Sequence, residues 1–280
     1  MTPKGWEAIK LNDVCDKVTS GSRNWAQYYS EEGSKFIRMT NLQRNSIYLD
    51  LSDLKFVDIQ DDSSDGKRTS LKAGDILMSI TAELGKIGWV HEGLGESFIN
   101  QHTALIRLKE NKAYSKYIAY LLSSKEMNHR INRLNDSGAK AGLNLTTIRS
   151  IPLTIAPVSE QQKIAKILST WDKAISTTER LIDNSTQQKK ALMQQLLTGK
   201  KRLLDESGKR FEGEWEEINI GSTSKCFSGG TPSRTKDEYY NGNIPWITSG
   251  KLNDRYVDSV NEYITELGLQ NSSAKIVKNG

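Results

Sequence analysis

Three short polar clusters in the first half of the chain carry side chains that could contact nucleic-acid bases. They are Arg38-Met39-Thr40-Asn41-Leu42-Gln43-Arg44, Asn100-Gln101-His102-Thr103 and Ser20-Gly21-Ser22-Arg23-Asn24-Trp25. Arginine, asparagine and glutamine side chains can each bond two atoms of a base edge at once, and the first cluster follows a predicted strand. Lys140 lies in a glycine-flanked loop, where its ammonium group could bind a phosphate. A single cluster of this kind is more often a solvated loop or cap, but the three together favour recognition of bases.

Motifs for catalysis are absent from the sequence. It has no glycine-rich loop before a Lys-Ser or Lys-Thr pair, which would bind nucleotide phosphates, and no Asn-Pro-Pro-Tyr-like or glycine-rich methyl-donor signature. The histidines at positions 91, 102 and 129 lack metal-ligand spacing. Glu83-Leu84-Gly85-Lys86 invites comparison with an acidic-lysine nuclease motif, but its spacing is wrong. We therefore expect no catalytic residues, no bound metal and no cofactor.

Composition and charge are compatible with a nucleic-acid partner but do not require one. The 280 residues include 39 basic and 34 acidic side chains, which gives a formal net charge of +5. The mean hydropathy of −0.58 indicates much exposed polar surface. Cys15 and Cys226 lie in different halves and suggest no disulfide framework. Because no signal-peptide layout and no apolar run of about 20 residues is found, the sequence predicts a cytoplasmic protein without a membrane partner.

Part of the sequence recurs about 210 positions later. The matching blocks are 6–9 with 215–218, 17–21 with 225–229, 28–29 with 239–240, and 36–37 with 246–247. Because one offset holds over several blocks, the chain is predicted to contain two copies of one domain. The second copy stops at Gly280, in line with Gly74, and nothing corresponds to residues 75–153. We therefore expect the second copy to be partial, with uncovered apolar faces.

A long helix is predicted between the copies. Ser159 is the expected N-cap, Gln162 its capping-box partner, and Gly199 the C-cap. Between them, residues alternate in steps of four and three along one seam, as in a coiled coil. The apolar seam residues are Ile164, Leu168, Trp171, Ile175, Ile182, Leu192 and Leu196. A helix of about 40 residues is about 60 Å long, so its seam is expected to pair with another helix rather than pack as a plain surface helix.

Residues 1–155 have the pattern of a mixed α/β domain. Apolar runs of strand length cover 36–39, 75–80, 86–90 and 104–108, with glycines at the turns, and residues 114–134 have helical spacing. The predicted organisation is a first domain over 1–155, a helical spacer over 156–204 and a partial second domain over 205–280.

These blocks resemble the specificity (S) subunits of type I restriction-modification enzymes. Within the first domain, the blocks that resemble their target-recognition domains are Gly74-Asp75-Ile76-Leu77-Met78-Ser79, Gly85-Lys86-Ile87-Gly88, Asn100-Gln101-His102 and Asn144-Leu145. Residues 157–164 and 191–199 resemble their helical spacer. The resemblance extends over the whole chain, and the departure is the missing second half of the second recognition domain.

The resemblance implies an α+β target-recognition domain, a coiled-coil-like spacer helix and a partial second recognition domain, without a catalytic site. Each recognition domain would bind one half of a bipartite target in double-stranded DNA, and the spacer would fix their separation. Methylase (M) subunits would dock on the seam and methylate adenine, and a restriction (R) subunit would join for cleavage. The candidate DNA contacts are Ser20, Arg23, Arg38, Thr40, Asn41, Arg44, Ser79, Lys86, Asn100, Gln101, His102 and Lys140.

Three further hypotheses remain open at this point. Two copies of the chain could pair antiparallel through residues 159–198 and form a homodimer with a palindromic target. The chain could instead be a stand-alone DNA-binding regulator, which would bind duplex DNA in isolation with a steep salt dependence. It could also be a coiled-coil interaction protein whose domains bind no DNA.

Overall fold

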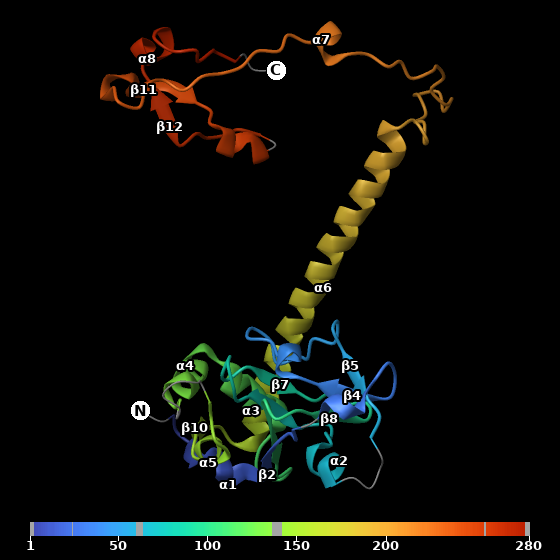
Figure 1. Cartoon of the computed structure of the whole chain (residues 1–280), viewed down its shortest axis with the longest axis vertical. Coiled ribbons are helices and arrows are strands. Elements are labelled where there is room, and N and C mark those ends of the chain that lie inside the picture. The colour runs from blue at the N-terminus through green and yellow to red at the C-terminus, as the bar shows by residue number, and fades with distance from the viewer. Residues whose placement is uncertain (1–2, 24, 60–63, 136–141, 255, 278–280) are drawn as a thin grey trace. The chain divides into compact units, whose positions relative to one another are not determined.

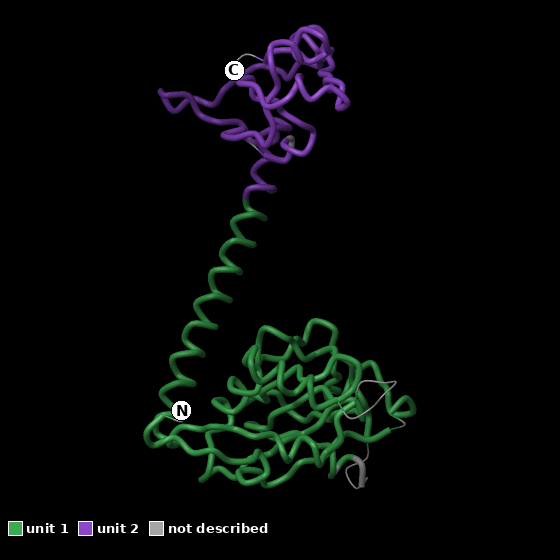
Figure 2. The backbone as a smooth tube through the Cα atoms, turned by 90° about the vertical axis from the view of Figure 1, so that its left-hand side faces the viewer, with its two compact units in different colours: residues 1–188 green, residues 189–280 purple. Residues whose placement is uncertain are grey.

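The structure, a computed structural model, describes all residues except 1–2, 24, 60–63, 136–141, 255 and 278–280, and it divides into two compact units (Figures 1 and 2). Unit 1 covers residues 1–188 and unit 2 covers residues 189–280. None of the helices in the described parts is long and apolar enough to cross a membrane.

Two four-stranded sheets form the centre of unit 1. The first has the order β2 (Cys15–Ser20), β9 (Thr103–Leu108), β6 (Ile76–Ser79) and β7 (Ile87–Trp89), and all its pairings are antiparallel. The second has the order β3 (Tyr29–Ser30), β5 (Lys55–Val57), β4 (Ser34–Ile37) and β8 (Ser97–Ile99), in which β4 and β8 are parallel. A separate pair joins β1 (Glu7–Lys10) to β10 (Pro152–Ile155).

The first sheet is buried on both of its faces, which explains the continuous apolar runs in its central strands. Side chains alternate between the faces of a strand, so Ile76 and Met78 of β6 enter the largest core while Leu77 enters a second one. In β9, Ile106 enters the largest core and Leu105 enters the second one. A half-exposed strand would need polar residues at every second position, whereas residues 76–78 of β6 and 104–106 of β9 are apolar one after another.

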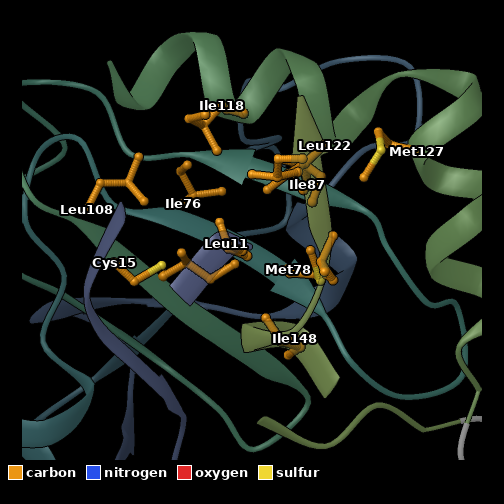
Figure 3. Close-up of a cluster of buried hydrophobic side chains, with 14 of the residues drawn as sticks. Leu11, Cys15, Ile76, Met78, Ile87, Leu108, Ile118, Leu122, Met127 and Ile148 are labelled. Carbon is orange, nitrogen blue, oxygen red and sulfur yellow. The ribbon is translucent and has the colours of Figure 1, made fainter. Parts of the chain in front are cut away.

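Short helices cover the largest core. They are α1 (Leu11–Val14), α3 (Ser115–Ser123), α4 (Lys125–Arg133) and α5 (Leu145–Arg149), and α2 (Ser64–Thr69) lies near β2 and β8. Figure 3 shows Ile118 and Leu122 of α3 packed over Ile76 and Ile87 of the first sheet. Two 3-10 turns, η1 (Trp25–Tyr28) and η2 (Met39–Asn41), complete the unit.

The helical stretch predicted over residues 114–134 is two helices rather than one. Ser124 separates α3 from α4 because its backbone is extended, with ψ at 146°, and its side chain accepts a hydrogen bond from the Met127 backbone nitrogen at 3.3 Å. It therefore acts as the N-cap of α4, a position that serine favours.

The long helix α6 (Val158–Leu197) matches the predicted one closely. It begins at Val158, one residue before Ser159, so the prediction that Ser159 is the N-cap is wrong. In the first turn, the backbone nitrogens of Glu160 and Gln161 donate to the Pro157 carbonyl. Gly199 follows its end with φ at +69°, the left-handed conformation expected of a residue that terminates a helix.

Unit 2 repeats part of the element order at the beginning of unit 1, without strands at the positions of β1 and β2. It contains α7 (Ile220–Thr223), η3 (Asp237–Tyr239), β11 (Tyr240–Trp246), η4 (Ser249–Asn253), β12 (Glu262–Ile264) and α8 (Glu266–Gln270). Tyr240 and Ile244 of β11 both pair with Ile264, just as Tyr29 and Ser34 both pair with Val57 in unit 1. The same irregular register in both places supports the repeat found in the sequence.

Apolar residues that are buried in unit 1 are exposed at the repeated positions of unit 2. Leu11 is fully buried, whereas Ile220 at the matching position is 73% exposed. Ile37 is likewise buried and Ile247 is 45% exposed. The expectation of uncovered apolar faces in the second copy is therefore confirmed.

Candidate nucleic-acid interface

Several strands of unit 1 begin or end at one shared edge, which we call the strand-end edge. It comprises Ser20–Arg23 after β2, Arg38–Arg44 after β4, the β6–β7 connection 79–86 and the β8–β9 connection 100–102. The pairings bring these segments together: Ser20 opposes Ala104, Ser79 opposes Thr103, and Ile37 opposes Ile99. An isolated bridge from Gln43 to Ile87 attaches the segment Arg38–Arg44 to the start of β7. The edge thus includes every described residue proposed from the sequence as a DNA contact.

Within the edge, the backbones of Gly21 and Asn100 approach each other closely. A Cβ atom added to Gly21 would lie 2.0 Å from the carbonyl oxygen of Asn100, so no larger residue fits without movement of the backbone. The Gly21 nitrogen donates to the Thr103 carbonyl at 3.1 Å, and Ser22 forms a bridge with Asn100. Glycine at this position therefore lets the segment after β2 lie directly against the β8–β9 connection.

A polar hollow lies where these two segments meet. Its lining residues are Ser20, Gly21, Ser22, Arg23, Arg68, Thr81, Gln101 and His102. The His102 ring is held from both sides, with Nδ1 at 2.8 Å from Thr81 Oγ1 and Nε2 at 2.9 Å from Gln101 Nε2. The hollow therefore presents ordered amide, imidazole and guanidinium groups together.

Arg68 belongs to this hollow although sequence analysis did not select it. It is contributed by α2 and donates to the Ser20 carbonyl at 2.6 Å and to the Ser22 hydroxyl. Lys17 donates to the Arg68 carbonyl at 3.1 Å, and burial, with the nearby Arg107 charge, lowers the pKa of Lys17. Nothing in the local sequence links α2 to the segment after β2, because the contact spans more than 40 positions.

Some of the proposed DNA contacts make hydrogen bonds that hold the edge in shape. Asn41 is 2% exposed, its Oδ1 accepts from the Arg38 nitrogen at 2.9 Å, and its amide donates to the Asp50 carbonyl at 2.8 Å. Ser79 is fully buried, donates to the Glu83 carbonyl and accepts from the Lys86 nitrogen at 2.8 Å. These two side chains shape the turns in which they lie.

Two cationic candidates outside the hollow, Arg38 and Lys86, form ion pairs. Arg38 donates to Asp53 at 2.8 Å, and this hydrogen bond and the Arg38 charge lower the pKa of Asp53. Lys86 Nζ lies 2.5 Å from Glu83 Oε2.

Four further candidates complete the predicted set. Arg44 donates to Asn128 Oδ1 at 2.7 Å, and Thr40 is exposed. The side-chain oxygen of Asn100 accepts from the His102 nitrogen at 3.2 Å. Lys140 lies outside the described residues, but Gly142, two positions later, bridges to Thr81 beside the hollow.

The predicted seam of α6 is exposed over most of its length. Trp171 is 66% exposed and Ile182 is 62% exposed, whereas Ile164 packs against the core of unit 1. The remaining seam residues, Leu168, Ile175, Leu192 and Leu196, are exposed or half-buried. Within the described ranges, no group of three or more His, Cys, Asp or Glu side chains is placed to hold a metal ion.

A family model for the type I restriction modification DNA specificity domain matches residues 3–185. The chain belongs to this family. The match covers the strand-end edge and α6 as far as residue 185, so it includes the quoted blocks of the first domain and residues 157–164 but not residues 191–199.

Individual relatives agree with this assignment. The chain is 27% identical over 258 residues to a putative type I restriction enzyme MjaX specificity subunit of Methanocaldococcus jannaschii, which is 88% of this chain and 59% of that protein. It is 29% identical over 180 residues to the EcoR124I/EcoR124II specificity subunit of Escherichia coli, which is 60% of this chain and 39% of that protein. The chain therefore spans less than two thirds of the length of either relative.

A solved structure shares the fold. The crystal structure of the type I restriction-modification system S subunit from M. genitalium superposes with a TM-score of 0.52 at 14% identity, over 90% of this chain and 59% of that one. The predicted fold class, an α+β domain carrying a long helix, is confirmed by the structure and by this similarity.

Proposed function

We propose that this chain is the non-catalytic DNA-sequence-recognition subunit of a type I restriction-modification complex. Unit 1 would bind one half of a bipartite target in double-stranded DNA through the strand-end edge. The observation that carries the proposal is the hollow, in which Arg23, Gln101 and His102 come together in a domain of the specificity family. An amide and an imidazole suit base edges, and the guanidinium groups of Arg23 and Arg68 suit phosphates.

The other subunits supply the reaction in this proposal. Methylase (M) subunits dock on the exposed seam of α6 and methylate adenine, and a restriction (R) subunit joins the complex in the cytoplasm. The seam supports a helical partner because Trp171, Ile175 and Ile182 lie exposed on one helix. A second copy of the chain, paired through the same helix, is a further candidate partner. Light scattering at micromolar concentration that gives a monomer both with and without the methylase would contradict this homodimer.

The experiment that tests DNA recognition compares variants in the complex with methylase. Arg23→Ala should weaken binding to all duplexes alike and lower the slope of log affinity against log salt by about 0.9, as expected for one lost phosphate contact. Gln101→Ala should instead cost about 1–3 kcal/mol of discrimination at one base pair. Mapping of methylated adenines in cells that express each variant with its methylase gives the target sequence and shows which base pairs each variant no longer discriminates.

The matched control is Lys112→Ala, because Lys112 is exposed and follows the opposite end of β9. Equal effects of Arg23→Ala and Lys112→Ala would refute the strand-end edge as the DNA interface. Tight sequence-specific binding by the chain without methylase would favour a stand-alone regulator. Absence of DNA binding even with methylase would favour an interaction protein.

A further inference from the structure

The first turns of α6 are attached to the recognition domain by a buried amide. Gln161 is 1% exposed, and its side chain satisfies two backbone groups of the domain. Its Oε1 accepts from the Tyr114 nitrogen at 2.8 Å, and its Nε2 donates to the Ala156 carbonyl at 2.7 Å. One turn later, Ala165 is 1% exposed and packs in the largest core. This first attachment fixes the position at which the helix leaves the domain.

A second attachment lies further along the helix, at Asp172. The Tyr120 hydroxyl of α3 donates to Asp172 Oδ2 at 2.5 Å, and the Tyr48 hydroxyl lies 3.5 Å from that of Tyr120. Burial, together with the hydrogen bond to Asp172, raises the pKa of Tyr120 above its usual range, so the phenol remains a donor. Lys116 lies over the rings of Tyr48 and Trp89, at 5.3 Å and 4.7 Å from their centroids.

The two attachments are on one face of the helix and the exposed seam is on another. Gln161 and Asp172 are eleven positions apart, which is close to three complete turns and about 16 Å. At about 100° per residue, the seam defined by Trp171, Ile175 and Ile182 is centred about a fifth of a turn, or about 70°, away from them. A helix held on one face at two points along its axis can neither rotate nor tilt freely. The attachments therefore determine where the seam faces.

We propose that Asp172, acting through Tyr120, is a positioning residue that sets the direction and rotation of α6 on the recognition domain. It thereby fixes the orientation of the seam relative to the strand-end edge. Tyr48 extends the same network to the segment that follows β4, because it lies four positions after Arg44. The proposal goes beyond DNA recognition itself, since it concerns how the domain is connected to whatever binds the seam.

Because α6 is long, a small tilt that follows loss of the Asp172 contact produces a large displacement further along the helix. Without this contact, the helix would be held only up to about Ala165. Residue 185 is 20 positions further on, or about 30 Å at 1.5 Å per residue, so a tilt of about 10° displaces it by about 5 Å. One base pair corresponds to about 3.4 Å along DNA. A flexible attachment would therefore blur the separation of two half-sites by more than one base pair.

The test measures the spread of one distance within the chain. Spin labels at Lys125→Cys on α4 and Ser185→Cys on α6, in a Cys226→Ser background, report the direction of the helix by pulsed electron resonance. Excess unlabelled chain removes distances between chains, and buried Cys15 stays unlabelled. Asp172→Ala and Tyr120→Phe should each broaden the distance distribution by about 5 Å. Asp172→Asn, which keeps an acceptor oxygen, should restore the narrow distribution.

The matched control is Asp183→Ala, which removes an exposed carboxylate of α6 that bonds only along the helix, to Gln187. The proposal would be overturned if the distance distributions of Asp172→Ala and Tyr120→Phe were as narrow as that of the parent chain. It would also be overturned if Asp183→Ala broadened the distribution as much as Asp172→Ala does. If Asp172→Ala does not fold, Tyr120→Phe still decides the question, because it removes a hydroxyl and leaves the ring in place.

A second measurement uses the complex with methylase and targets whose half-sites are one base pair closer or further apart. Asp172→Ala should raise methylation of the altered targets relative to the native one, whereas a uniform loss at all spacings would indicate only damage to the fold and overturn the positioning role. Because the spin-label experiment needs no DNA, failure of the proposed DNA recognition would leave its outcome unchanged.

Discussion

Gly21 offers a sharp test of the strand-end edge, because a single methyl group should disturb it. In Gly21→Ala the added Cβ would meet the Asn100 carbonyl oxygen at 2.0 Å and carbon at 2.2 Å, well inside ordinary contact distances. Gly21 does not have a positive φ, so the effect is steric rather than conformational. Relief requires the two segments to separate by more than 1 Å, and overpacking of this kind costs about 1–3 kcal/mol.

The expected result is a lower melting temperature and weaker DNA binding together. For a unit of this size, about 1–3 kcal/mol corresponds to a fall of roughly 2–12 °C in Tm by calorimetry. DNA affinity should fall as well, because a binding constellation is sensitive to displacements of about 0.5 Å and Arg23 and Gln101 would no longer be held together. Affinity is measured at one fixed salt concentration in the complex with methylase.

The repeat supplies a matched control for this prediction. Gly229 occupies the position of Gly21 in the second copy, and a Cβ atom added there meets nothing within 4 Å. Gly229→Ala should be neutral or stabilise by about 0.4–1 kcal/mol through the unfolded chain. The reasoning is refuted if Gly21→Ala melts with the parent chain and binds DNA equally well, or if both variants lose the same stability.

Two further predictions concern buried groups of unit 1. Asp75 is 1% exposed and accepts from Arg107 at 2.8 Å and 2.7 Å, so Asp75→Ala should cost about 1.5–3 kcal/mol by leaving the half-buried Arg107 guanidinium without its carboxylate. Asp53→Ala removes an exposed carboxylate and should change the midpoint of urea denaturation little. Equal shifts of the midpoint in Asp75→Ala and Asp53→Ala would contradict the expectation that the buried carboxylate matters more. Burial raises the pKa of Cys15 to about 12, so at pH 8 its thiolate fraction is about one in ten thousand. A thiol reagent should therefore modify Cys226 fast and Cys15 only on unfolding, and rapid reaction of both would argue against the buried position.

The elements that sequence analysis predicted are those whose burial leaves a pattern in the local sequence. The runs at 75–80 and 104–108 have consecutive apolar residues at 76–78 and 104–106 because both faces of β6 and β9 are covered there. The seam of α6 is visible because it repeats over many turns. The pairing of β4 with β8 left no such mark, since parallel strands far apart in sequence are joined by backbone atoms that every residue has. The break at Ser124 was missed because the apolar spacing continues across it.

Sequence analysis selected segments that the fold brings together at the strand-end edge, but it did not predict the contacts within that edge. Residue type located Gln101 and Arg23 at the edge because their side chains are long, polar and close to strand ends. The same reasoning selected Asn41 and Ser79, which the structure shows bonded within their own turns. Residue type cannot distinguish an amide that points to solvent from one that caps a turn. Arg68 was missed for the opposite reason, since only the tertiary fold brings α2 to the hollow.

The pairing of β1 with β10 has a consequence for how such chains can change. Glu7 lies opposite Ile155, so the polypeptide enters and leaves the recognition domain at neighbouring points. The block between these strands can be exchanged for another of different sequence while the point from which α6 departs stays in place. One recombination event could therefore replace the whole strand-end edge and leave α6 untouched.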